Sequence, residues 1–123
     1  MRGGLQDDSN AVPEENLKTE IWVMAHIRRC SAEGIPATVA RKGDLSAGTL
    51  MLKINRLEHG CLVLSQMRDM DGALGWLAAF DGDLVPESQA DEYVARAVSR
   101  DPDLWVVEIE DRDGRHPFPG KIL

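Results

Sequence analysis

The chain has 123 residues, which suits one domain and is too short for two ordinary ones. Its net charge of −7 argues against bulk attraction to nucleic acid or to an anionic lipid surface. No apolar run approaches the ~20 residues that span a bilayer, and the first residues lack the apolar core of a secretory signal. We therefore expect a cytoplasmic protein with no membrane contact and no nucleic-acid partner.

The first predicted elements are a tail and a helix. Residues 1–16 are polar and acidic and have no apolar period, so we expect a disordered tail. The stretch NLKTEIWVMAHIRRCSAEG predicts a helix that Asn16 can cap and that Gly34 and Pro36 end. Its polar arc contains Trp22, a large aromatic residue that needs a reason to face water.

Two apolar runs follow, PATVARK and TLMLKINR, joined by the loop GDLSAG. They predict a basic β-hairpin with Arg41 and Lys42 beside a turn whose glycines allow positive φ. Further strands are predicted at CLVLSQM, ALGWLAAF and LWVVEIE, and a second helix from about Pro86 to Arg100.

The predicted order is therefore α-β-β-β-β-α-β. Short turns between consecutive strands favour a mainly antiparallel sheet of about five strands. Two amphipathic helices on one face would complete a two-layer α+β domain over residues 17–116, followed by a C-terminal tail at 117–123.

These elements resemble a known family. The segments that carry the likeness are LKTEIWVMAHIRRC, PATVARKGDLSAGTLMLKIN and QADEYVARAVSRDPDLWVVEIEDRDGR, of which DPDLWVVEIEDR is the most specific. Together they are similar to a bacterial, mainly alphaproteobacterial, family catalogued as domain of unknown function 1491, from Leu17 to Arg115. The resemblance implies a small single-domain cytoplasmic protein and assigns no catalytic residue.

The GDLSAG loop has two glycines five residues apart, as a phosphate-binding P-loop does. That motif needs a lysine after the second glycine and then a helix. Thr49 and a predicted strand stand there instead, so the sequence excludes a nucleotide P-loop.

A metal site is a second hypothesis. Two histidines and two cysteines can close a tetrahedral zinc shell, and here they occur as His26 and Cys30 on one helix and His59 and Cys61 around a turn. The spacing differs from the usual short zinc knuckles. We expect no metal and no cofactor, and keep this set as the alternative.

The last strand places Glu108 and Glu110 on one face, because i and i+2 residues of a strand point the same way. Paired carboxylates can perform acid–base chemistry or bind a hard cation. The simpler interpretation is a solvated sheet face where they form cross-strand ion pairs with Lys53, Arg41 or Arg56.

Trp22, His26 and Arg29 lie along one ridge of the first helix. Trp and Arg are frequent interface anchors. Alternatively, Trp22 packs against a loop or the C-terminal tail, with Arg29 in cation–π contact.

The sequence therefore favours a binding or interaction module, with an unidentified protein or a second copy as partner, over an enzyme. The alternative is a small enzyme or anion-binding protein that uses the basic hairpin (Arg41 and Lys42), Lys53, and the glutamates Glu108 and Glu110.

Overall fold

The computed structural model describes residues 18–123. Its elements are α2 (Thr19–Ala32), β1 (Ala37–Arg41), β2 (Leu50–Asn55), the 3-10 turn η2 (Leu57–His59), β3 (Cys61–Arg68), β4 (Leu74–Ala78), the 3-10 turn η3 (Ala79–Gly82), α3 (Glu87–Arg100), β5 (Trp105–Glu110) and β6 (Lys121–Ile122). The α+β class and the predicted order are confirmed, with β6 as an additional short strand. The predicted tail over 1–16 and the Asn16 cap lie outside the described residues.

The six strands form one open sheet in the order β1-β5-β2-β3-β4-β6. Most neighbours are antiparallel, but β5 runs parallel to β2 and β6 runs parallel to β4. The predicted hairpin between the first two strands is wrong, because β5 lies between β1 and β2 and pairs with both. A nearly continuous apolar run such as WVVEI suits this central position, where both faces of a strand are covered.

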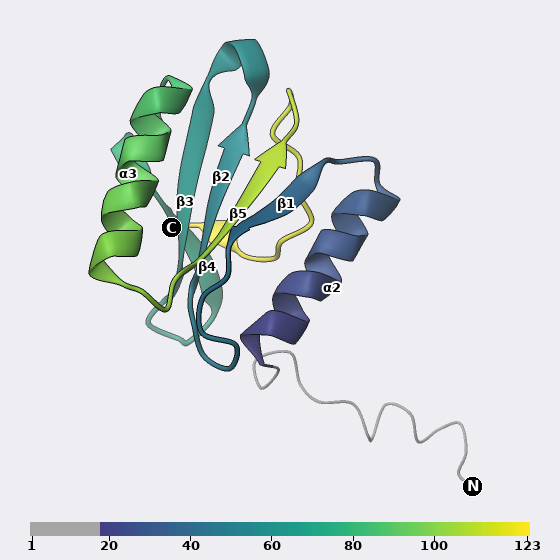
Figure 1. The fold of residues 1–123 in the computed structure, drawn as a ribbon, viewed down its shortest axis with the longest axis vertical. Helices are drawn as coiled ribbons and strands as arrows, with labels where there is room; N and C mark the ends of the chain where they lie inside the picture. The colour runs from purple at the N-terminus through teal and green to yellow at the C-terminus, as the bar shows by residue number, and fades with distance from the viewer. Residues whose placement is uncertain (1–17) are drawn as a thin grey trace, which may run out of the picture.

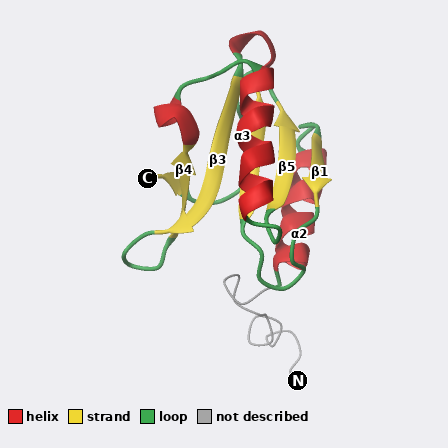
Figure 2. Cartoon of the chain, turned by 60° about the vertical axis from the view of Figure 1, so that its left-hand side comes forward, coloured by secondary structure: helices red, strands yellow, loops and turns green. Residues whose placement is uncertain are grey.

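The helices lie on opposite faces of the sheet instead of sharing one, so the domain has three layers (Figure 1). Alternating side chains of the central strands point to the two helices: Leu52 and Val107 pack with residues of α2, and Met51 and Val106 pack with residues of α3. Figure 2 shows α3 lying in front of the sheet. Two amphipathic helices need two apolar surfaces, and the central strands provide one on each side.

The 42–49 loop is fixed against the start of β5. Asp44 N–H donates to the Asp103 carbonyl, and Trp105 Nε1–H donates to the Asp44 carbonyl at 2.7 Å. Neither Gly43 nor Gly48 has a positive φ, which corrects the prediction for this turn. Both are required for close approach instead, since an added Cβ would lie 2.1 Å (Gly43) or 2.2 Å (Gly48) from the Asp103 oxygen.

Gly48→Ala is therefore expected to lower the free energy of unfolding by about 2–3 kcal/mol, because the added methyl group meets backbone that cannot move freely. Gly75→Ala is the matched control: the atoms nearest to its Cβ would belong to the side chain of Leu123, from 2.8 Å away, and this C-terminal residue is 43% exposed. We expect it to cost less than about 1 kcal/mol. Urea unfolding of both variants measures the difference, and equal costs would contradict the close-approach argument.

The C-terminal residues are part of the packed structure. Phe118 is 4% exposed and belongs to the core beside α2. Trp76 Nε1–H donates to the Pro119 carbonyl at 2.9 Å, and β6 pairs with β4. This segment therefore covers Trp22 of α2, as one of the two interpretations of Trp22 proposed. It also extends the sheet, which the prediction of a tail at 117–123 did not include.

Candidate functional site

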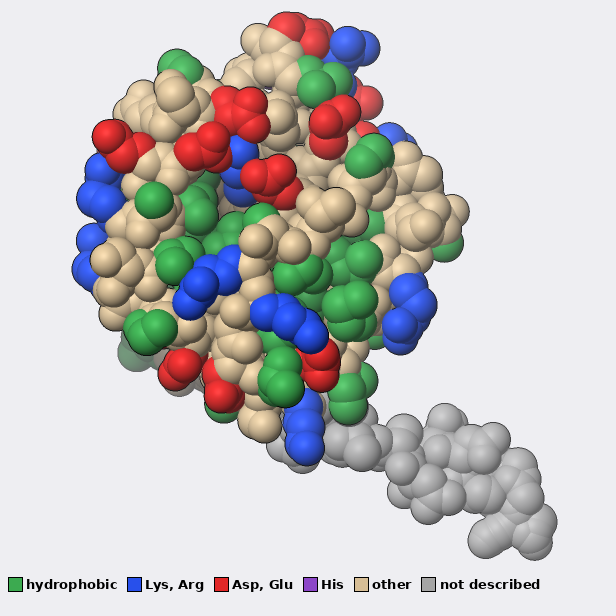
Figure 3. All heavy atoms as spheres, in the orientation of Figure 1, with side chains coloured by type: hydrophobic (Ala, Val, Ile, Leu, Met, Phe, Trp, Pro, Cys, Tyr) green, Lys and Arg blue, Asp and Glu red, His purple; other side chains and the backbone are tan. Residues whose placement is uncertain are grey.

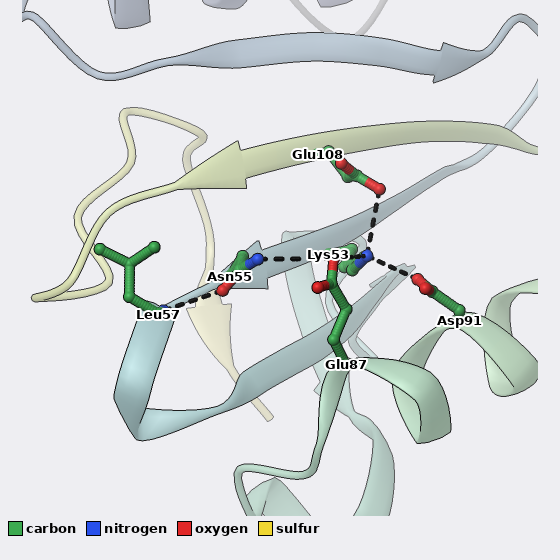
Figure 4. A network of polar contacts seen from close by, with 6 residues as sticks. All are labelled: Lys53, Asn55, Leu57, Glu87, Asp91 and Glu108. Carbon is green, nitrogen blue, oxygen red and sulfur yellow. Dashed lines mark hydrogen bonds and ion pairs between the residues drawn. The ribbon is translucent and has the colours of Figure 1, made fainter.

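Lys53 is the centre of a polar network between β2, β5 and α3 (Figure 4). Its ammonium group donates to Asp91 at 2.5 Å, to Glu87 at 2.8 Å and to Glu108 at 3.1 Å. The Lys53 side chain is only 3% exposed, whereas each carboxylate side chain is about half exposed. Because Glu87 and Asp91 lie in the first turns of α3, the network ties this end of the helix to the sheet.

The network leaves Lys53 positively charged and without capacity for another anion. Burial lowers the pKa of Lys53, but the hydrogen bonds that its ammonium group donates to Asp91, Glu87 and Glu108 outweigh this effect, so the pKa lies above the ordinary lysine value. Three carboxylates around one ammonium give the site a net negative charge. Figure 3, in the orientation of Figure 1, shows Asp and Glu side chains gathered over the upper half of the face toward the viewer. These features are typical of a structural ion-pair network and not of an anion-binding site.

The predicted basic residues of the loop are also paired. Arg41 Nη2 donates to the Pro102 carbonyl at 2.9 Å. Lys42 pairs with Glu20 of α2 at 3.1 Å. The loop itself caps α2, since Thr19 and Glu20 N–H donate to the Ser46 and Leu45 carbonyls. These contacts hold the loop to the helix, and they use the N–H groups of Thr19 and Glu20 at the start of α2 inside the protein.

Trp22 and His26 lie inside the protein, each 7% exposed. Their rings contact Phe118 from the C-terminal segment, at centroid distances of 5.7 Å and 5.2 Å. Arg29 is exposed, and its Nη1 lies 3.4 Å from His26 Nδ1. A partner that approaches this ridge would therefore meet Arg29 and the C-terminal segment rather than Trp22.

The four residues of the zinc alternative are not brought together. Cys30, like His26, packs on the α2 side of the sheet, whereas Cys61 packs on the α3 side. His59 is exposed in η2 and lies 3.6 Å from Glu58. Within residues 18–123, no group of three or more His, Cys, Asp or Glu side chains is placed to hold a metal ion. Burial raises the pKa of both thiols, which disfavours reactive thiolates.

A pocket of about 500 Å³ opens beside the N-terminal end of α2. Its walls come from five segments: α2 (Thr19 and Trp22), the loop (Ser46, Ala47, Gly48 and Thr49), β3 (Gln66 and Arg68), β4 (Leu74) and the C-terminal segment (Pro119). The volume lies in the ~300–1,000 Å³ range of small-molecule sites.

Two polar groups of the pocket wall are used to hold it in shape. Gln66 Oε1 accepts from the backbone N–H of Leu50 at 2.9 Å, and Thr19 Oγ1 donates to the Gly48 carbonyl at 3.0 Å. Arg68 is exposed and donates through Nη1 to the Gly72 carbonyl at 2.9 Å. The pocket therefore combines a fixed wall with one accessible guanidinium.

Sequence reasoning missed this pocket because its walls are distant in the chain. One signal was present in β3. Leu62 and Leu64 face the α2 side, and the same face then becomes polar at Gln66 and Arg68. Polar residues at core-facing positions of a strand indicate either a solvated end or a site.

Comparison with known proteins identifies related chains. Residues 17–119 match the model of the DUF1491 family, described as protein of unknown function. A crystal structure of a DUF1491 family protein from Caulobacter crescentus CB15 is 44% identical, with a TM-score of 0.78 over 87% of this chain and 99% of that one. The NMR structure of a DUF1491 family protein from the same organism is 43% identical, with a TM-score of 0.75 over 88% and 97%.

A more distant structure, protein Atu0922 from A. tumefaciens, is 28% identical, with a TM-score of 0.64 over 77% of this chain and 86% of that one. The curated proteins give no match. In the part of the chain that the structure describes, neither helix is long and apolar enough to cross a bilayer.

Proposed function

Since this chain belongs to the DUF1491 family, which supplies no activity, we propose its function from its own side chains: it is a binding module whose ligand site is the pocket beside α2. The observation that carries the proposal is the chemistry of the pocket wall. An aromatic ring, several small apolar groups, hydroxyls and one guanidinium surround a space of about 500 Å³. A concave space of this size that combines apolar surface with placed polar groups is typical of small-molecule sites.

The same lining favours binding over catalysis. General acid–base chemistry needs a His, Asp, Glu, Lys, Tyr or Cys within hydrogen-bond reach of the substrate. None of the residues between 18 and 123 that line the pocket is of these types, so the hydroxyls of Thr19, Ser46 and Thr49 have no such base among them. An enzyme at the Lys53 network is less well supported, because its ammonium group is occupied by three carboxylates.

A screen of small compounds by amide ¹⁵N–¹H correlation spectra of the full chain tests the proposal. We expect binders to shift signals of the residues that line the pocket. Ala47→Phe, which fills the pocket from an exposed loop position, should abolish these shifts. Ala95→Phe, an exposed position on α3 across the sheet, is the matched control and should retain them. Compounds that bind Ala47→Phe unchanged, or a screen without binders, would contradict the proposal.

A further inference from the structure

Resting on this proposed function, we propose that the pocket takes a monocarboxylate with an apolar body, whose carboxylate pairs with Arg68. The charge of the pocket lining favours an anion. Among residues 18–123, Arg68 is the charged residue that lines the pocket, and no Asp or Glu of this range does. An anion that enters therefore meets one positive charge and no carboxylate in the wall.

The guanidinium of Arg68 is available for such a pair. It is exposed, and the hydrogen bond from Nη1 to Gly72 leaves its other N–H donors for a ligand. Among residues 18–123, no Asp or Glu forms an ion pair with it. Guanidinium groups bind carboxylates through parallel charge-assisted hydrogen bonds, which fix both position and orientation.

The loop limits the ligand to a single negative charge. In a phosphate site, several backbone N–H groups point at the anion. Here the N–H groups of Ser46 and Ala47 donate to Asp44 Oδ2 instead, at 3.2 Å and 2.8 Å. A dianion would find no second cation among the lining residues of the 18–123 range, and it would meet two amides already bonded to Asp44, whose charge lies close by.

The rest of the wall suits an apolar body. Trp22, Ala47, Leu74 and Pro119 contribute apolar surface from four different segments. Apolar surface removed from water on both partners favours association. The hydroxyls of Ser46 and Thr49, both exposed, are neutral donors that can complete the carboxylate's hydrogen bonds.

The experiment titrates the full chain with a panel of aryl-alkyl carboxylates, including 4-phenylbutyrate, and with the neutral amide of each acid. Amide shifts of the pocket residues measure affinity. We expect each acid that binds to do so about tenfold or more tightly than its amide, as for a hydrogen bond to a charged group. Arg68→Met should remove this preference and leave the affinity for the amide unchanged. Arg100→Met, an exposed arginine on α3, should change neither.

The outcomes separate the two proposals. Acids and amides that bind equally well in the pocket, or an Arg68→Met variant that keeps the preference, would overturn the carboxylate assignment while the pocket remains a binding site. Tighter binding of 4-phenylbutyl phosphate than of 4-phenylbutyrate would overturn the limit to one charge. A panel in which no member shifts the pocket signals would contradict the proposed function together with this inference.

Discussion

Replacing Phe118 with Ala is expected to lower the free energy of unfolding by about 3 kcal/mol, within the range for a buried aromatic residue. Phe118 is 4% exposed, and its ring contacts both Trp22 and His26. Its removal leaves a cavity over α2 and exposes the two rings to water. Urea unfolding followed by far-ultraviolet circular dichroism measures the loss.

A matched control lies in the same segment. Ile122 is also a large apolar residue near the C-terminus, but its side chain is 55% exposed. Ile122→Ala is expected to cost less than about 1 kcal/mol, as exposed substitutions usually do. Equal costs for Phe118→Ala and Ile122→Ala would contradict the conclusion that the C-terminal segment is part of the core.

Local patterns predicted the elements of this fold because each pattern is read from neighbouring residues. The alternation of Leu50, Leu52 and Ile54 with Met51 and Lys53 correctly separated the two faces of β2. The pairing of Lys53 with Glu108 was also among the ion pairs proposed from the sequence. Both follow from the two-residue period of a strand.

The order of the strands had no such local signal. The insertion of β5 between β1 and β2 joins it to segments more than fifty residues earlier in the chain, and nothing in these segments specifies their partner. The C-terminal segment gave only an indirect signal, for a different reason. Phe118 stands between Pro117 and Pro119, which disfavour regular structure. The signal for its burial was elsewhere, in Trp22, an aromatic residue on a polar helix arc that required a cover.

Lys53→Met is expected to lower the free energy of unfolding by about 2–3 kcal/mol. The substitution preserves most of the buried apolar length but removes the charge that holds Glu87, Asp91 and Glu108 together. Removing one partner of a fully buried ion pair costs ~3–5 kcal/mol. We expect less here because the three carboxylate side chains are 45–56% exposed and water can solvate them.

Two further variants test the cause of this loss. Lys18 is exposed, so Lys18→Met should change stability by less than about 0.5 kcal/mol. Adding Asp91→Asn to Lys53→Met removes one of the three repelling charges and should recover part of the lost stability. A double variant no more stable than Lys53→Met alone would contradict an electrostatic origin and assign the loss to packing.

The pH dependence of stability tests whether Lys53 stabilises the fold through its charge. The pKa of Lys53 is raised in the folded protein above the ordinary value of 10.5. When folding raises the pKa of a lysine, the resulting stabilisation is complete at pH values below the pKa of the unfolded state. It is lost as the pH rises through the pKa of the folded state. The stability difference between the wild type and Lys53→Met should therefore be constant from pH 7 to about 9 and shrink above about 10.5. A difference that grows in the alkaline range would show that Lys53 does not act through its charge, and that α3 is held to the sheet by its apolar contacts alone.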